Sequence, residues 1–110
     1  MIINDPAIDI EVMMGFTPAV STTDTDLYRA IETVTRRHFP ASKVVPSVAG
    51  GFTDSHFFRD MGIVSYGFAP MVLTPNEANR IHGNDERISV QNVRDGVQVV
   101  LEILQAVVYE

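Results

Sequence analysis

The sequence KVVPSVAGGFTDSHFFRDMGIVSYGF, at residues 43–68, decides the predicted fold. Residues 43–48 are rich in β-branched side chains, which favours a short strand, and Pro46 places that strand at an edge or ends it early. The pair Gly50-Gly51 then breaks it. Residues 63–68 have the same character, so they are predicted as a second strand.

Residues 53–61, between these two strands, fit a short helix. Thr53 or Asp54 can cap its first turn, and Gly62 can close its last one. A strand, a helix and a strand in this order are typical of an α/β unit with at least some parallel pairing.

The flanking segments extend the same pattern. Apolar and acidic residues alternate over residues 7–16, which predicts a half-buried strand, and residues 24–39 show the 3–4 spacing of an amphipathic helix. Residues 69–87 form a long loop with one helical turn at 75–80, and residues 89–109 form a buried helix with a broad apolar stripe. We therefore predict an α/β fold, a layered sheet with packed helices.

Composition narrows the possible functions. The chain has 110 residues, enough for one domain, with 14 acidic and 8 basic residues and a net charge of −6. The basic residues form no run, which argues against nucleic acid and against anionic membranes as partners. No cysteine is present, so any metal site must use His, Asp, Glu or water. No signal peptide is visible, which favours a cytoplasmic location, and the compartment is otherwise open.

The glycine loop at residues 50–55 is the first candidate site. Gly50 and Gly51 would allow a ligand to approach the backbone closely, and the N–H groups of the following turn would favour an anion. The carboxylate of Asp54 would compete with such an anion. A plain tight turn that leads into a capped helix explains the same residues equally well.

The loop at residues 80–87 is the second candidate. His82 stands in it beside glycine and acidic residues, where an imidazole can bind a metal or act as a general base. A surface histidine in a solvated, charged loop is the alternative. A zinc site needs three or four protein ligands. The other two histidines, His38 at a helix end and His56 within residues 53–61, have no ligand spacing to His82 or to each other.

Three segments taken together resemble a known family. They are VPSVAGGFTDSHFFR at 45–59, GIVSYGFAP at 62–70 and RIHGNDERISV at 80–90. In this order and spacing they resemble the C-terminal part of the aminoacylase/carboxypeptidase family of dizinc metallopeptidases. That family includes glutamate carboxypeptidase, the carboxypeptidase-S-like enzymes and succinyl-diaminopimelate desuccinylase, and the carboxypeptidase-S-like branch is the most similar.

The resemblance implies a substrate pocket at the glycine loop. Gly51, Thr53 and Asp54 match the loop in which backbone and hydroxyl groups meet the carboxylate of the substrate. Phe52 stands where many members have Ser, Thr or Ala, so this position departs from the family pattern.

The resemblance also implies one metal ligand. His82 matches the last zinc ligand of the family, which holds one of two zinc ions. Asp85 and Glu86 match acidic positions that support its loop. By the same resemblance, residues 1–16 are the end of a lid-domain strand and residues 17–110 are the C-terminal segment of a zinc-dependent exopeptidase (phosphorylase/hydrolase-like) catalytic domain.

The resemblance finally implies an activity for the whole enzyme and an incomplete site in this chain. The enzyme would cleave an amide or peptide bond next to a free carboxylate, in a small peptide or an N-acyl amino acid, through a metal-bound water and a Glu base. The remaining zinc ligands and that base have no counterpart in these 110 residues. We expect an inactive segment with no catalytic residue of its own and no tight zinc binding. The alternative is a non-catalytic binding or dimerisation domain, since the apolar face of residues 89–109 favours a homo-oligomer.

Overall fold

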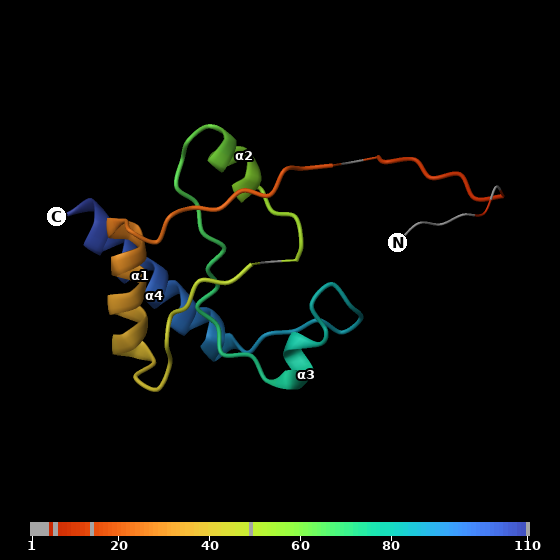
Figure 1. Cartoon of the computed structure of the whole chain (residues 1–110). Helices are drawn as coiled ribbons and strands as arrows, with labels where there is room; N and C mark the ends of the chain where they lie inside the picture. The colour runs from red at the N-terminus through yellow and green to blue at the C-terminus, as the bar shows by residue number, and fades with distance from the viewer. Residues whose placement is uncertain (1–4, 6, 14, 49, 110) are drawn as a thin grey trace.

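The computed structural model describes residues 5, 7–13, 15–48 and 50–109. In these residues the chain forms four helices joined by long irregular segments (Figure 1). The helices are α1 (Asp26–His38), α2 (Ser55–Asp60), α3 (Pro75–Ala78) and α4 (Val90–Val108).

The predicted layered α/β sheet is wrong, because the described part of the chain contains no strand. The three segments predicted as strands run without a ladder of backbone hydrogen bonds, and residues 7–13 extend away from the helices (Figure 1). At Ser65, in the last of them, a side chain takes the place of a partner strand. The Ser21 hydroxyl accepts the Ser65 N–H at 3.1 Å and donates to the Ser65 carbonyl at 2.9 Å.

Helix α1 begins and ends close to the predicted limits, because its ends carry local signals. The Thr25 hydroxyl accepts the N–H of Tyr28 at 3.1 Å and so caps the first turn. The last turn ends at Phe39, whose N–H donates to the Thr35 carbonyl at 2.7 Å. Pro40 follows, and its ring cannot continue a helix.

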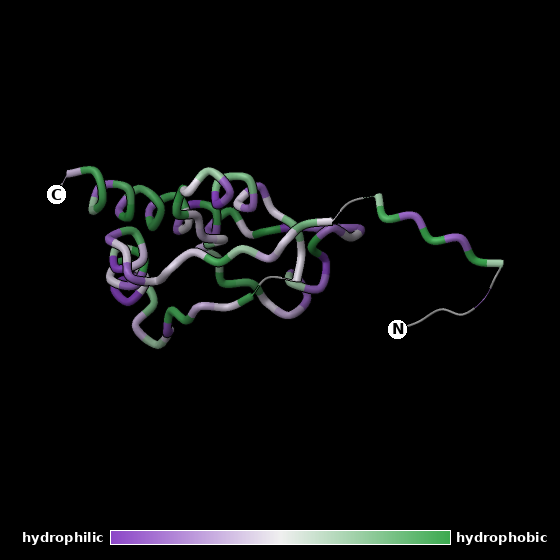
Figure 2. The backbone as a smooth tube through the Cα atoms, turned by 45° about the horizontal axis from the view of Figure 1, so that its top comes forward, coloured by the Kyte–Doolittle hydropathy of each residue, from purple (hydrophilic) through white to green (hydrophobic). Residues whose placement is uncertain are grey.

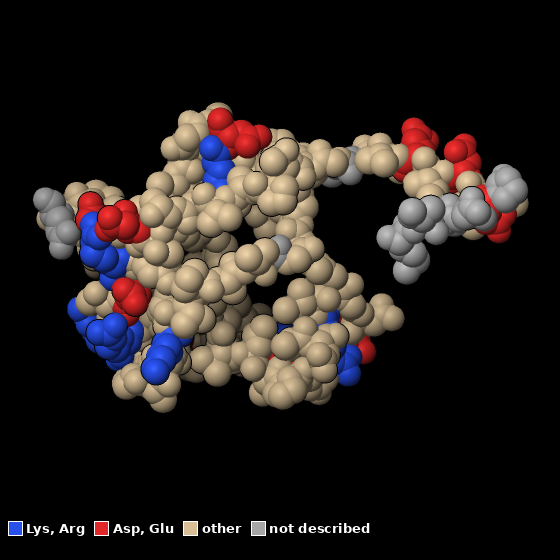
Figure 3. All heavy atoms as spheres, in the orientation of Figure 1, with Lys and Arg blue, Asp and Glu red and all other residues tan. Residues whose placement is uncertain are grey.

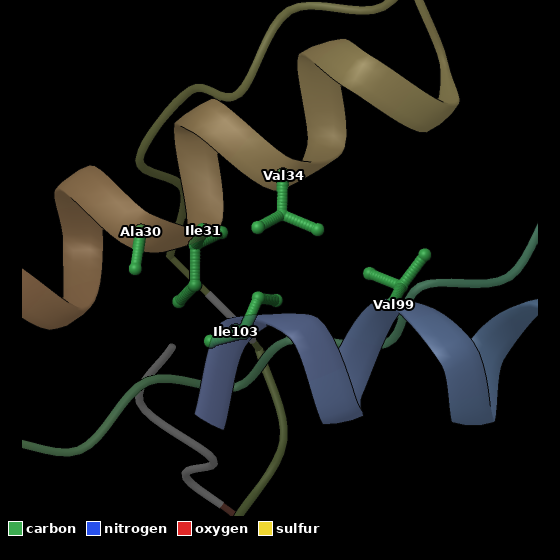
Figure 4. Packing of buried hydrophobic residues seen from close by; sticks show 5 residues of the cluster. All are labelled: Ala30, Ile31, Val34, Val99 and Ile103. Carbon is green, nitrogen blue, oxygen red and sulfur yellow. The ribbon is translucent and has the colours of Figure 1, made fainter. Parts of the chain in front are cut away.

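Helix α4 was predicted correctly as a helix and wrongly as a buried one. Ser89 caps it by accepting the Asn92 N–H at 3.1 Å. One neighbouring helix, α1, packs against it, so only part of its apolar stripe is covered. The mainly hydrophobic colour of this helix can be followed in Figure 2. The buried hydrophobic core contains three residues of α1 and two of α4, whose side chains point toward one another (Figure 4): Ala30, Ile31, Val34, Val99 and Ile103.

A polar contact supplements this core. Glu102 of α4 lies 3.0 Å from Arg37 and 3.0 Å from His38, both in the last turn of α1. The hydrogen bond from Gln98, followed by the nearby His38 ring, holds the pKa of the Glu102 carboxyl below its usual range. The ionised carboxylate therefore favours the packed arrangement of the two helices.

Charged side chains are distributed unevenly over the surface of the chain. In the view of Figure 3, basic side chains gather over α1 and acidic ones follow the extended N-terminal segment. None of the helices in the described residues is long and apolar enough to span a bilayer.

Candidate functional site

The glycine loop lies on the surface, immediately before α2. A Cβ atom at Gly50 or Gly51 would meet no other heavy atom within 4 Å, so nothing within the described chain requires glycine at these positions. Thr53 and Asp54 accept the N–H groups of the first turn of α2 through their carbonyls, each at 3.1 Å. The Asp54 side chain makes no capping hydrogen bond. The loop is thus open to a ligand that approaches from outside.

A hydrogen-bonded cluster holds α2 in place, and with it the glycine loop. The Arg59 guanidinium donates to the Ser21 hydroxyl at 3.1 Å and to the Ser65 carbonyl at 2.8 Å. The Ser65 hydroxyl donates to the Ser55 hydroxyl at 2.8 Å. Two separate segments of the chain, at Ser21 and Ser65, therefore meet at one side of α2. We call these four residues the Arg59 cluster.

The second candidate loop, which contains His82, is folded on itself. The Gly83 N–H donates to the Arg80 carbonyl at 2.8 Å, and the His82 N–H donates to the Glu86 carboxylate at 3.2 Å. Arg80 also lies 3.4 Å from the Asp85 carboxylate. Both predicted supporting carboxylates therefore contact residues of the loop.

The backbone of this loop takes an uncommon conformation at two positions. His82 has a φ of 62° and Asp85 a φ of 58°, both in the left-handed region. Among residues with a side chain, His, Asp and Asn tolerate this region best. Residues 81–90, which include His82, are all exposed to solvent.

The donor set of the described residues does not fit a zinc ion. No group of three or more His, Asp or Glu side chains converges there in a way that could hold a metal. The Glu86 carboxylate accepts the backbone N–H of His82, and no described hydrogen bond joins it to the His82 ring. No described hydrogen bond or ion pair joins the His82 loop to the glycine loop. His82 as a zinc ligand, and Gly51, Thr53 and Asp54 as substrate contacts, stay predictions.

An aromatic cluster lies beside the glycine loop. The rings of Phe16 and Phe52 stack with centroids 4.3 Å apart, and His56 meets Phe16 edge-on at 4.5 Å. Phe57 meets Phe52 at 5.6 Å and an angle of 80°. His56 Nε2 lies 3.2 Å from the Asp60 carboxylate one turn along α2. We call the four rings of Phe16, Phe52, His56 and Phe57 the aromatic cluster.

Neither the Arg59 cluster nor the aromatic cluster could be predicted from the sequence. In the sequence, His56 and Arg59 stand out only as parts of the motif at residues 45–59. The crowding of aromatic residues at positions 52, 56, 57 and 58 was the available signal. Phe16 and Ser21 could not be added to it, because both lie more than thirty positions away along the chain.

Comparison with known proteins identifies a matching protein family. The model of peptidase family M20/M25/M40 matches residues 6–106. The chain is 33% identical over 105 residues to the N-fatty-acyl-amino acid synthase/hydrolase PM20D1 of Xenopus tropicalis and 32% identical over 108 residues to that of Homo sapiens. It is 26% identical over 106 residues to the "Probable carboxypeptidase S-like 2" of Dictyostelium discoideum.

These matches cover nearly all of this chain but only a small part of each relative. Each covers 94% of this chain, but only 20%, 22% and 20% of the three relatives in that order. The chain thus spans about a fifth of the length of the curated relatives it matches. No solved structure matches it. The family model alone covers nearly all of the chain and both candidate loops, and so the chain belongs to peptidase family M20/M25/M40.

Proposed function

We propose that this chain works as the C-terminal segment of a zinc-dependent amidohydrolase, which cleaves an amide or peptide bond next to a free carboxylate. The observation that carries the proposal is the family match over residues 6–106, which contains the glycine loop and the His82 loop. The names of two relatives, an N-fatty-acyl-amino acid synthase/hydrolase and a carboxypeptidase S-like protein, support the same class of bond.

The large surface of the chain supports its role as one part of a larger unit. Its accessible surface is 9211 Å² at a mass of 12.2 kDa. A compact monomer of that mass exposes about 6,000 Å². The radius of gyration is 18.1 Å, whereas a compact domain of this length has about 13 Å. A partner polypeptide that covered the excess of roughly 3,000 Å² would form an interface of the size found in permanent complexes.

The contribution of the chain to such a site is limited. In the proposed enzyme, the backbone of Gly51 and the Thr53 hydroxyl bind the carboxylate of the substrate, and the Arg59 cluster keeps them in place. His82 supplies one metal ligand. Because a zinc site needs three or four protein ligands, the other ligands and the general base come from outside these residues, and the chain alone is inactive.

A chimaera tests this proposal. The matching fifth of the Xenopus tropicalis relative is replaced by this chain, and hydrolysis of an N-acyl amino acid is measured on the purified, folded protein. We expect activity in the chimaera, and a loss of at least 100-fold with His82→Ala, because a metal ligand is removed. The matched control is His38→Ala, which changes a histidine at the α1–α4 contact and leaves the loops intact.

Two results would contradict the proposal. One is amide hydrolysis by the 110-residue chain alone that a chelator stops, since the chain would then hold a complete site. The other is a folded chimaera that binds zinc and hydrolyses no N-acyl amino acid or dipeptide.

Self-association through α4 is the second candidate function. The exposed apolar residues of this helix favour it, and an apolar groove of about 200 Å³ lies beside them between α1 and α4. The groove is lined by Leu27, Ile31, Tyr66, Phe68, Val100, Ile103 and Leu104. Light scattering after size exclusion decides this point. A dimer that Leu104→Glu abolishes supports it, and a monomer at all concentrations contradicts it.

A further inference from the structure

We propose that Ser21 is a positioning residue for the proposed reaction. Its hydroxyl fixes Ser65 and Arg59, and through them the turn at residues 53–54 beside which the substrate carboxylate would be bound. The inference rests on the proposed function, because it starts from a carboxylate site in the glycine loop. It goes further by giving a role in substrate binding to a residue that lies outside that loop and far from it along the chain.

The hydroxyl of Ser21 is fully occupied by partners within the chain. It accepts the Ser65 N–H at 3.1 Å and the Nε–H of Arg59 at 3.1 Å, and it donates to the Ser65 carbonyl at 2.9 Å. A serine hydroxyl has one donor hydrogen and two acceptor lone pairs, so no capacity remains for a ligand. Ser21 therefore holds other residues in place and does not itself bind the substrate.

The two partners of Ser21 reach both ends of α2. Ser65 donates through its own hydroxyl to that of Ser55, the first residue of α2, at 2.8 Å. Arg59, in the last turn, donates to the Ser65 carbonyl at 2.8 Å as well as to Ser21. The segment that leads into α1 thus passes beside α2 and is joined to it at one hydroxyl (Figure 1).

Few other contacts determine where α2 lies. The helix has six residues, none of them buried, and its cap residue Asp54 makes no side-chain hydrogen bond. In the part of the chain that the structure describes, no other helix packs against it. A helix this short is not stable on its own in water, so contacts with other segments fix its position. Apart from the ring contacts with Phe16, the Arg59 cluster supplies these contacts.

The position of α2 determines that of the candidate carboxylate site. The carbonyls of Thr53 and Asp54 accept N–H groups from the first turn of the helix, each at 3.1 Å. A shift of α2 would carry these two residues with it, and with them the Thr53 hydroxyl and the adjoining backbone of Gly51. Loss of the Ser21 hydroxyl would release the groups that hold the helix, so the site would be misplaced although no group that contacts the ligand had changed.

This arrangement predicts which kinetic constant should change. The carboxylate beside the cleaved bond is not itself altered in the reaction, so it is bound in the ground state and in the transition state alike. Weakening such uniform binding raises KM and leaves kcat nearly unchanged. Loss of the metal ligand proposed at His82 should instead lower kcat, because the metal acts on the reacting water.

The chimaera that carries this chain tests the role with a matched pair of variants. Ser21→Thr keeps the hydroxyl, and Ser21→Val replaces it with a methyl group of similar size. We expect Ser21→Val to raise KM for the N-acyl amino acid about tenfold with kcat changed less than about twofold, and Ser21→Thr to keep most of the affinity. Thr23→Val is the control, because Thr23 is exposed two residues along the same segment and its hydroxyl makes no described hydrogen bond.

Two results with an active chimaera would overturn the role of Ser21 and leave the proposed function standing. One is the same KM in Ser21→Val and Thr23→Val. The other is a fall in kcat as large as any rise in KM, because the residue would then act on the chemistry or on folding as a whole. If Ser21→Val does not fold, Arg59→Lys takes its place with the same expected rise in KM, since an ammonium group lacks the planar fork that reaches Ser21 and Ser65 together.

The 110-residue chain tests the positioning even if the chimaera is inactive and the proposed function fails. Amide hydrogen exchange followed by NMR should be about tenfold faster at residues 56 and 57 in Ser21→Val than in Ser21→Thr, with exchange in α1 and α4 unchanged. Equal exchange at residues 56 and 57 in the two variants would contradict the proposal, because the hydroxyl would then not hold α2.

Discussion

Val99→Ala tests whether the α1–α4 contact is the true core of this chain. Val99 is 0% exposed, and the substitution removes two buried methyl groups, worth roughly 0.8 kcal/mol each. The cavity that remains adds to this loss, so the free energy of unfolding should fall by about 2–3 kcal/mol. Urea denaturation followed by far-UV circular dichroism measures it. With a slope of about 1–3 kcal/mol per molar urea, the midpoint should fall by roughly 1 M or more.

Val97→Ala is the matched control for this experiment. Val97 lies two residues earlier on the same helix, undergoes the same chemical change and is 63% exposed. Its substitution should change the free energy of unfolding by no more than about 0.5 kcal/mol. Equal losses in the two variants would refute the reasoning, because burial against α1 would then not distinguish the two valines.

Three further predictions concern charge and the candidate site. The lowered pKa of Glu102, which follows mainly from the Gln98 hydrogen bond, stabilises the fold above the ordinary value of 4.5, and this stability should be lost as the pH falls through the lower pKa of the folded state. Thermal unfolding between about pH 6 and pH 3 measures this effect, and Glu102→Gln should abolish it. Arg59→Ala should destabilise α2 by about 1 kcal/mol and speed its amide hydrogen exchange, because the Ser65 carbonyl loses a charged donor; unchanged exchange would show that the cluster does not hold the helix. Calorimetry should find no tight zinc binding to the 110-residue chain, with or without His82→Ala, and tight stoichiometric binding lost in that variant would mean that the chain completes a metal site.

The helices could be predicted because their signals lie close together in the sequence. Thr25 and Ser89 cap the first turns of α1 and α4 through hydrogen bonds that reach three residues ahead. Thr74 forms a capping box with Glu77 at α3 in the same way. A hydrogen bond of this range depends on neighbours that the sequence places beside each other, so the element follows from a few adjacent residues.

The prediction of a sheet was wrong, because alternation indicates an extended segment and says nothing about a partner strand. A strand is stable only when a neighbouring backbone takes up its N–H and C=O groups. At Ser65 the side chains of Ser21 and Arg59 take up these groups instead. The segment around Ser65 has no neighbouring strand, and side chains take up its backbone groups.

For the candidate site, too, some features could be predicted from the sequence and others could not. The motifs around Asp54 and His82 indicated the family from the order of residues alone, and the family match confirmed it. The turn at His82, with its left-handed backbone, and the contacts of Asp85 and Glu86 within it could be seen only in three dimensions.

Local chemistry along the chain accounts for the four helices, their caps and the family. Three-dimensional packing accounts for which apolar residues are buried: the stripe of α4 is broad, yet Val99 and Ile103 face α1 while Val97 and Leu104 remain exposed. It also brings Phe16 onto Phe52 and Ser21 onto Ser65. The physical reason is that a cap or a turn is complete within a few residues, whereas burial depends on how much surface distant segments offer. In the described chain α1 is the one helix that packs on α4, and the segment at residues 66–72 adds a few further contacts.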